Sequence, residues 1–343
     1  MLSTLRKLFG FLVKLGLLLA LLAAVAGYFA WQHYRGFAGT PVGGTPAATL
    51  VVERGDSFAQ VLDKLRAAGV ATGSDLEWKA LATEMQAHPR IQVGEYALDA
   101  ALTPRQIIDK LIVGDIIRHR FTIVEGWSMR DLRAALGRHD VLEDDVRTLD
   151  DAALMAKLDR AGVPAEGRFL PETYLFTRGD GALSVLDQAA DAMDAALAEA
   201  WAARAADTPL RSPEELLTLA SIVEKETGKA SERPEIAGVF ARRLELGMRL
   251  QTDPTVIYGL GAAFDGNLRR VDLETDTPFN TYTRFGLPPH PIAMPGRAAL
   301  MAAAQPLEGE TLFFVARGDG SHHFSRTYPE HRDAVRRYQL GGR

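Results

Sequence analysis

The sequence predicts an α+β protein with a single N-terminal transmembrane helix, a small α+β module and a larger α+β domain. Three observations predict this class. A long run without charged residues lies near the N-terminus, a short strand-and-helix unit follows a segment rich in Gly, Pro and Thr, and the remaining chain begins with helices and continues with short strands. Helices followed by short strands are typical of an α+β domain and not of a doubly wound sheet.

The composition agrees with a folded chain of this size. Its 343 residues suffice for two domains plus an appendage, and 47% hydrophobic with 24% charged residues is ordinary for globular proteins. A net charge of -5 argues against a nucleic-acid-binding protein, which is normally basic. The sequence contains no cysteine, so disulfides, thiolate zinc sites, cysteine nucleophiles and a lipoprotein anchor are excluded.

The N-terminal segment predicts a membrane anchor. Arg6, Lys7 and Lys14 precede an uncharged run over residues 15–31. Counted from Phe11, the apolar segment reaches the roughly 20 residues that span a bilayer as a helix. Because positive flanks stay in the cytoplasm, we expect a single-pass protein of the inner (cytoplasmic) membrane with its body on the periplasmic, extracytoplasmic side.

A cleaved signal peptide is the alternative reading of this segment, since Ala24-Val25-Ala26 fits the small-residue cleavage pattern. The apolar run is longer than the apolar h-region of a typical signal peptide and continues through bulky aromatic residues, which favours the uncleaved anchor over residues 1–35. Both interpretations place the body outside the cytoplasm.

A linker is predicted over residues 36–48 and a small module over 49–117. A β-type run from Thr49 ends at Gly55-Asp56-Ser57, where Asp56 or Ser57 can cap a helix. Further elements are expected as follows: a helix with Phe58, Val61, Leu62 and Leu65 inside, a second after Ser74-Asp75, a strand near 94–96, and a helix opened by Thr103-Pro104. This entry resembles the lysin-motif (LysM) fold, which binds N-acetylglucosamine polymers, although ordinary capping would give the same pattern.

The larger domain is predicted over residues 118–335, followed by a tail over 336–343. Its expected elements are a strand at 118–127, a helix capped by Ser128, helices at 186–206, 213–228 and 232–247, and then a stretch rich in strands and turns through residue 330. Familiar nucleotide-binding loops, Gly-x-Ser-x-Gly and His-Glu-x-x-His do not occur in the sequence. Neighbours on a strand point to opposite faces, so His322 and His323, with His290 upstream, are not expected to share a metal ion.

Glu226 is the leading candidate for acid–base chemistry. The predicted helix places it at the end of an apolar stripe formed by Leu219, Ile222 and Val223, where partial desolvation raises the pKa of a carboxyl. Protonation of a glycosidic oxygen needs such a group. Glu224 lies on another side of the helix. A solvated Glu-Lys-Glu at a helix end is the alternative that the pattern leaves open.

Several segments together resemble the YceG-like endolytic murein transglycosylases. They occur in the order found in that family and span about residues 50–335. The segments are Glu166-Gly-Arg-Phe-Leu-Pro-Glu-Thr-Tyr174, Ala220-Ser-Ile-Val-Glu-Lys-Glu-Thr227, Gly247-Met-Arg-Leu-Gln-Thr-Asp-Pro-Thr255, Phe279-Asn-Thr-Tyr282 and Gly286-Leu-Pro-Pro289. The resemblance implies a membrane anchor, a LysM-like module and a catalytic glutamate in the second segment.

Within that segment we expect Glu226 to be catalytic, since Glu226-Thr227 is similar to the Glu-Ser pair of lysozyme-like lytic transglycosylases, with Glu224 as the fallback. Other residues that match family motifs are expected to line a glycan groove, or else to stabilise turns. These residues are Glu172, Gln251, Thr252, Asp253, Asn280 and Tyr282.

The resemblance implies a lyase that cleaves the bond between N-acetylmuramic acid (MurNAc) and N-acetylglucosamine (GlcNAc) within peptidoglycan strands. The products would carry 1,6-anhydro-MurNAc ends, and nascent strands would be terminated or trimmed, without metal or organic cofactor. Two alternatives stand beside it. A hydrolytic muramidase would use Glu172 or Asp253 as a second carboxylate, and a non-enzymatic scaffold would bind glycan within cell-wall synthesis complexes. Expected partners are peptidoglycan strands and cell-wall synthesis proteins of the membrane.

Overall fold

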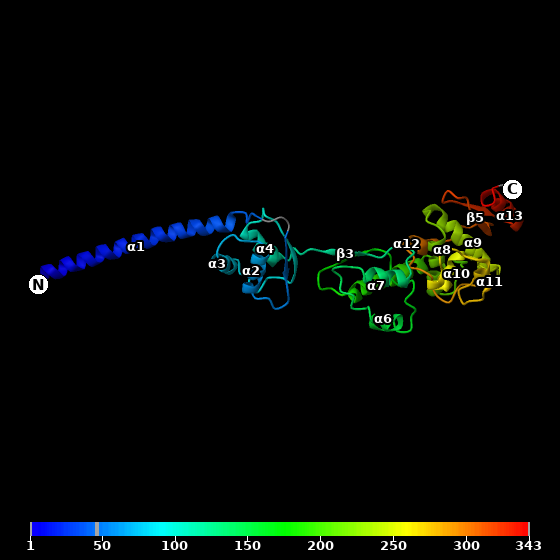
Figure 1. Cartoon of the computed structure of the whole chain (residues 1–343), viewed down its shortest axis with the longest axis horizontal. Coiled ribbons are helices and arrows are strands. Elements are labelled where there is room, and N and C mark those ends of the chain that lie inside the picture. The colour runs from blue at the N-terminus through cyan, green and yellow to red at the C-terminus, as the bar shows by residue number, and fades with distance from the viewer. Residues whose placement is uncertain (1, 45–47, 342–343) are drawn as a thin grey trace. The chain divides into compact units, whose positions relative to one another are not determined.

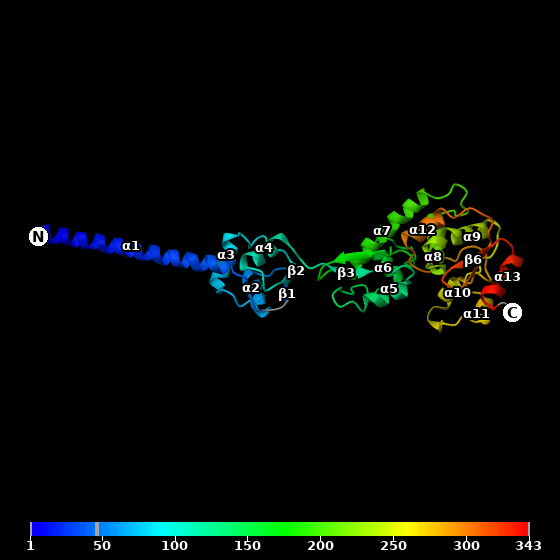
Figure 2. The ribbon, with the colours of Figure 1, turned by 90° about the horizontal axis from the view of Figure 1, so that it is seen from above.

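The computed structural model describes residues 2–44 and 48–341, so residues 45–47 of the predicted linker lie outside the described part. The chain divides into two compact units, the first ending at Arg118 and the second beginning at His119. Each unit is described by itself below, and Figures 1 and 2 show the elements of both. Both units contain helices and short strands, which confirms the predicted mixture of α and β structure.

Helix α1 (Leu2–Gly39) opens the first unit and is long and apolar enough to cross a membrane. The helix continues past residue 35 into the segment predicted as a linker. Its last turns belong to the core of the module, because the ring of Phe37 is buried and meets Trp78 edge-on at 5.6 Å between centroids. His33 also lies 3.2 Å from Glu77. The helix therefore ends inside the module and not before it.

The module contains a two-stranded antiparallel sheet and three helices. Leu50 of one strand pairs with Tyr96 of the other, and both side chains are buried. Its elements are β1 (Ala48–Val52), α2 (Phe58–Ala67), α3 (Asp75–Glu84), β2 (Gly94–Leu98) and α4 (Pro104–Val113). Ser57, Ser74 and Thr103 open the three helices at the predicted starts, and each forms a reciprocal capping box.

The second unit begins with a strand pair and the helices that cover it. Phe121 pairs with Tyr174 across the antiparallel ladder, and both are buried. The elements of this part are β3 (His119–Thr122), α5 (Met129–Leu136), α6 (Asp151–Lys157), β4 (Thr173–Phe176) and α7 (Ala182–Ala202). Ser128 caps α5 as predicted. Helix α7 begins earlier than expected, because Gly181 at its N-cap makes no side-chain hydrogen bond and gives no sequence signal.

A cluster of packed helices forms the core of the second unit. Helix α8 packs against α9, α12 and α7, and Figure 1 shows α8, α9 and α12 beside one another. The elements from here to the C-terminus are α8 (Pro213–Glu226), η1 (Ala230–Glu232), α9 (Arg233–Glu245), α10 (Asp253–Leu260), η2 (Gly261–Ala263), α11 (Arg270–Glu274), α12 (Arg297–Ala304), β5 (Phe313–Ala316), β6 (His322–Ser325) and α13 (Tyr328–Tyr338). Strands β5 and β6 pair antiparallel, and α13 packs against both.

The prediction that residues after 247 are rich in strands and turns is wrong where three helices form, and the strands β5 and β6 lie only near the end of that stretch. Helices α10, α11 and α12 lie within it. Pro254, which suggests a turn, occupies the first turn of α10, where proline is well tolerated. Helix α12 follows Gly296, which offers no capping side chain. Its alanine residues form a helix because that helix is buried against α8.

Candidate active site

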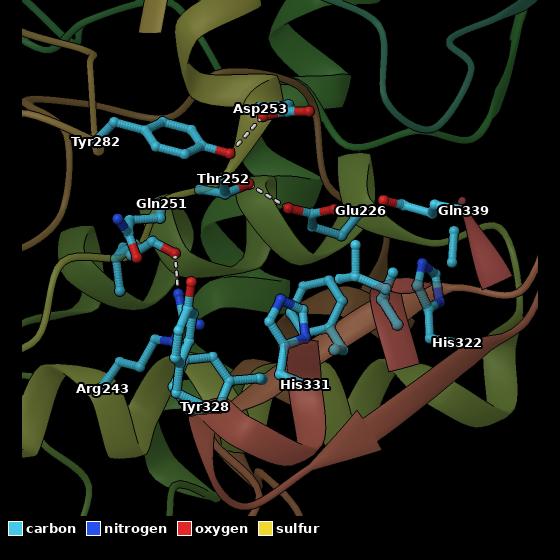
Figure 3. Close-up of a pocket in the computed structure, with 16 residues that line it drawn as sticks. Glu226, Arg243, Gln251, Thr252, Asp253, Tyr282, His322, Tyr328, His331 and Gln339 are labelled. Atoms are coloured by element: carbon cyan, nitrogen blue, oxygen red, sulfur yellow. Dashed lines mark hydrogen bonds between the residues drawn. The ribbon is translucent and has the colours of Figure 1, made fainter. Parts of the chain in front are cut away.

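Helix α8 carries Glu226 as its last residue. The helix begins after Ser212, whose hydroxyl caps it, and Thr227 already has extended backbone. Every residue over 216–223 is buried, so α8 is enclosed on all sides before its last turn and not only along the predicted stripe. The last turn brings Glu226 to a cavity of about 420 Å³, which Figure 3 shows. Residues from α8, α9, α10, both C-terminal strands and α13 line this cavity.

Thr252 is the hydrogen-bond partner of Glu226. Its hydroxyl donates to Oε1 of the carboxyl, as the dashed line in Figure 3 marks. The backbone N–H of Thr252 in turn donates to Oγ1 of Thr281 at 3.1 Å. The preceding residue, Gln251, has a left-handed backbone with φ of 49°, which is uncommon for a residue other than glycine. A strained residue beside the carboxyl's partner is typical of a functional site.

Burial is the main reason why Glu226 is a weak acid. Desolvation raises its pKa from 4.5 to about 7. The hydrogen bond from Thr252 opposes this shift, the negative charge of Asp253 adds to it, and the charges of His322 and Arg243 oppose it. A carboxyl with this pKa is present in both protonation states near neutral pH and can therefore donate a proton and take one back.

Glu224 has a different environment, although it lies only two residues away. Its Oε1 accepts from Arg233 at 3.0 Å and its Oε2 accepts from the backbone N–H of Gly296 at 2.9 Å. The Glu224 side chain is 4% exposed and does not line the cavity. Burial raises its pKa too, against the opposing effects of Gly296 and Arg233. These contacts tie α8 to α9 and to the start of α12.

Asp253 and Tyr282 form a second polar pair in the same cavity. The Tyr282 hydroxyl donates to Oδ1 of Asp253 at 2.6 Å, and both residues line the cavity with Gln251 and Thr252. In Figure 3 this pair lies on one side of Thr252 and Glu226 on the other. The structure thus brings Glu226 and four of the six predicted groove residues together.

The other two predicted groove residues, Asn280 and Glu172, do not line the cavity. The Asn280 side chain is fully buried and donates to three backbone carbonyls, those of Asp272, Leu273 and Thr275. Its Oδ1 accepts from the backbone N–H of Tyr282, so it shapes the loop that presents Tyr282. Glu172 pairs with Arg297 at 3.1 Å.

Further residues of the cavity were not among the predicted site residues. His322 lines it, and its Nδ1 lies 2.8 Å from Oε2 of Glu232. Arg243 donates to the carbonyl of Leu250 at 2.6 Å and so supports the backbone just before Gln251. His331 lies against the ring of Phe313 at 5.3 Å. These residues form a wall of the Glu226 cavity to which the C-terminal strands and the helices α9 and α13 contribute. The sequence offers only the His322-His323 pair as a signal for this wall.

Comparison with known proteins adds to this geometry. A family model described as the YceG-like family matches residues 50–337. The chain is 32% identical over 264 residues to the endolytic murein transglycosylase of Bacillus subtilis, covering 72% of this chain and 73% of that protein.

The endolytic murein transglycosylase of Streptococcus pneumoniae is 24% identical over 360 residues, covering 94% of this chain and 64% of the relative. Among solved structures, a putative YceG-like protein from Listeria monocytogenes aligns with a TM-score of 0.54 at 28% identity, over 85% of this chain and 100% of that one.

Proposed function

This chain belongs to the YceG-like family and is an enzyme of the lytic murein transglycosylase class, and within that class we propose that Glu226 is its catalytic residue. The proposed reaction cleaves the MurNAc–GlcNAc bond within peptidoglycan strands and leaves 1,6-anhydro-MurNAc ends. The observation that carries the proposal is the half-buried Glu226 carboxyl, which lies in a cavity, is hydrogen-bonded by Thr252 and has a pKa of about 7.

In the first half of the proposed reaction, protonated Glu226 donates its proton to the glycosidic oxygen. The bond from that oxygen to C1 of MurNAc breaks, and GlcNAc leaves with a new hydroxyl. The ionised carboxylate then accepts the proton of the MurNAc C6 hydroxyl while O6 attacks C1 and closes the 1,6-anhydro ring. No water is consumed, and Glu226 ends protonated as it began. Because the nucleophile belongs to the substrate, no second molecule has to be ordered.

The neighbours of Glu226 support both steps. The Thr252 hydroxyl favours the carboxylate that exists between the two proton transfers, because it donates to it. The Asp253 charge favours the protonated acid, because it raises the pKa of Glu226. We propose that Gln251 and the Tyr282–Asp253 pair contact the glycan, and that Asn280 acts by holding the loop of Tyr282.

A hydrolytic muramidase is the second candidate, favoured by one observation. Asp253 is a carboxyl group in the same cavity as Glu226, and a hydrolase needs a second carboxylate to direct water. Mass spectrometry of the muropeptides released from intact sacculi separates the two candidates. The proposed lyase gives 1,6-anhydro-MurNAc ends that lack one water relative to reducing ends. Products with reducing ends would establish the hydrolase instead.

We also propose that the first unit holds the enzyme at the inner membrane and binds glycan. Arg6, Lys7 and Lys14 before the apolar part of α1 support a cytoplasmic N-terminus and an extracytoplasmic body. The order β1, α2, α3, β2 with its capped helices supports a LysM-like role in binding N-acetylglucosamine polymers. Membrane-bound cell-wall synthesis proteins are the proposed partners, and termination of nascent strands is the proposed outcome.

A further inference from the structure

The second unit contains another cavity, of about 560 Å³, that the proposed mechanism does not use. Its walls come from α5, α8 and α10. It shares structural elements with the cavity of Glu226, since Lys225 and Pro254 line this one while their chain neighbours Glu226 and Asp253 line the other. A ligand held here would therefore lie beside the end of α8 at which the proposed chemistry takes place.

Glu166 is the buried polar group of this second cavity. Its carboxyl oxygens both lie 3.1 Å from the backbone N–H of Met129, and the Tyr258 hydroxyl donates to Oε2 at 3.1 Å. The residue is 6% exposed, and burial raises its pKa to about 7. A Cβ on the next residue, Gly167, would come within 2.5 Å of Pro291, so the backbone that presents Glu166 requires glycine. This carboxyl can accept a hydrogen bond from a peptide N–H and, when protonated, can donate one to a peptide carbonyl.

Among the described residues, one charged side chain on the rim of the second cavity has no hydrogen-bond partner. Asp131 is engaged by the N-cap Ser128, and Asp151 accepts from Arg133 at 2.6 Å. Lys225 donates to the carbonyl of Gly126 at 3.1 Å. Arg130 lines the cavity and has no hydrogen bond or ion pair with any residue over 2–44 or 48–341. A free guanidinium at the mouth of a cavity suits a ligand with a carboxylate.

We propose that this second cavity binds the peptide stem of the substrate, with Arg130 pairing to a stem carboxylate; the proposal rests on the proposed function. The stem is joined to MurNAc through a lactyl ether and projects away from the glycan, so a site beside the cleavage cavity would meet it. Met129, Ile257 and Ile292 offer apolar contacts to its alanine methyl groups, and Glu166 offers a partner for its amides. This site would make recognition depend on the stem.

The test compares two substrates made from one preparation of uncrosslinked glycan strands, one intact and one stripped of its stems by an amidase. We expect the wild type to cleave the intact strands with a kcat/KM about tenfold higher, the size of one charge-assisted hydrogen bond. In R130E the preference for intact strands should vanish. The KM for intact strands should rise, whereas kcat/KM on stripped strands should stay unchanged. R138E is the matched control, since Arg138 is exposed, does not line this cavity and should keep the preference.

The substitution should not unfold the protein, because a glutamate in the first turn of α5 is favourable at a helix N-terminus. Equal rates of the wild type on both substrates, or a preference retained by R130E, would overturn the proposal. A wild type that cleaves neither substrate would count against the proposed function instead. In that case NMR titration with the free stem tripeptide tests the stem site by itself, because binding of the stem needs no catalysis. Binding to the wild type and not to R130E supports the site, and absence of binding to the wild type rejects it.

Discussion

Nη2 of Arg233 lies 3.0 Å from Oε1 of Glu224, in a pair whose side chains are 11% and 4% exposed. The neighbouring candidate, Glu226, has a hydroxyl as its partner and opens to a cavity. Both carboxyl oxygens of Glu224 already accept hydrogen bonds, from Arg233 and from the backbone of Gly296, and the side chain does not line the cavity, so no substrate atom in that cavity can receive its proton. The two glutamates of one helix turn are therefore suited to different tasks, one to joining helices and one to proton transfer.

E226Q should lose about 100- to 10,000-fold in turnover, because glutamine can neither donate nor accept the proton. E224Q should keep most of its activity, but its unfolding free energy should fall by about 1–3 kcal/mol, since Arg233 loses the nearer of its two carboxylate partners and keeps only Glu125 at 3.4 Å. Release of 1,6-anhydro products and thermal unfolding measure the two effects. An inactive but well-folded E224Q together with an active E226Q would reverse the assignment.

The stability of E226Q provides a further check. Burial raises the pKa of Glu226 above its ordinary value of 4.5, to about 7. As pH rises between these values the unfolded chain loses a proton that the folded chain retains, so the wild type is progressively destabilised. Glutamine does not ionise. E226Q should thus unfold at a higher temperature than the wild type at pH 8 and at a similar one near pH 4. A lower unfolding temperature at pH 8 would contradict the burial argument.

The pH profile of kcat/KM should fall above pH about 7, where free Glu226 loses its proton. D253N should move this alkaline limb to lower pH, because the negative charge of Asp253 raises the pKa of Glu226. Asparagine keeps an oxygen that can accept from Tyr282. Asp265 pairs with Arg269 on the surface, so D265N is the control that should leave the limb in place. An alkaline limb at the same pH in D253N as in the wild type would show that Asp253 does not set the pKa of Glu226.

Thr252 should act by positioning Glu226 and stabilising its carboxylate. T252V keeps the side-chain volume and removes the donor, so activity should fall roughly tenfold, the size of one hydrogen bond to a charged group. The alkaline limb should move to higher pH, because the hydroxyl lowers the pKa of Glu226. T252S restores the donor, so both the rate and the pH of the alkaline limb should return to the wild-type values. Loss of rate without a moved limb would mean that the hydroxyl orients Glu226 without setting its pKa.

Membrane placement can be tested with a reporter fused after the C-terminus. An export-dependent reporter should be active there, and the full-length protein should sediment with membranes. Moving the positive charges of Arg6, Lys7 and Lys14 to the other end of the apolar run should reduce reporter activity. A mature protein that begins at Gly27 would show that the segment is a cleaved signal peptide.

Deleting residues 49–117 should weaken binding to intact sacculi more than it slows cleavage of short soluble strands. Because the deletion uncovers Phe37, the deleted form should also carry Phe37→Ser, and a full-length F37S variant serves as its control. Co-sedimentation with sacculi measures the binding. Equal sedimentation of both forms would reduce the module to a spacer.

The sequence predicts the elements whose signals are local. Ser57, Thr103, Ser128 and Ser212 open helices where they are expected, because each cap is a contact within one turn. The segment of Glu226 could also be found, since a carboxyl follows an apolar helix. The wall formed by His322 and Arg243 could not, because it depends on contacts between strands, helices and a loop far apart in the chain.

The second cavity cannot be predicted from the sequence, for a related reason. Glu166 lies in a segment that resembles the family, but its partners Met129 and Tyr258 are distant in sequence. Asn280 shows the opposite case. Its residue type suggests a ligand contact, yet three backbone carbonyls occupy its donors. The burial of a polar residue depends on long-range packing, and a single sequence does not reveal that packing.

In the proposed membrane placement, the last turns of α1 set the height of the module above the bilayer. Trp31 is exposed and suits the headgroup region, whereas Phe37, six residues later, lies in the module core. Six residues of helix rise about 9 Å, so the module would stand directly on the lipid surface, without a tether. With the proposed glycan-binding role, the module would reach only glycan within that thin layer. Inserting four alanines after Gln32 would lift the module by about 6 Å, measurable as reduced quenching of a module fluorophore by lipid-headgroup probes.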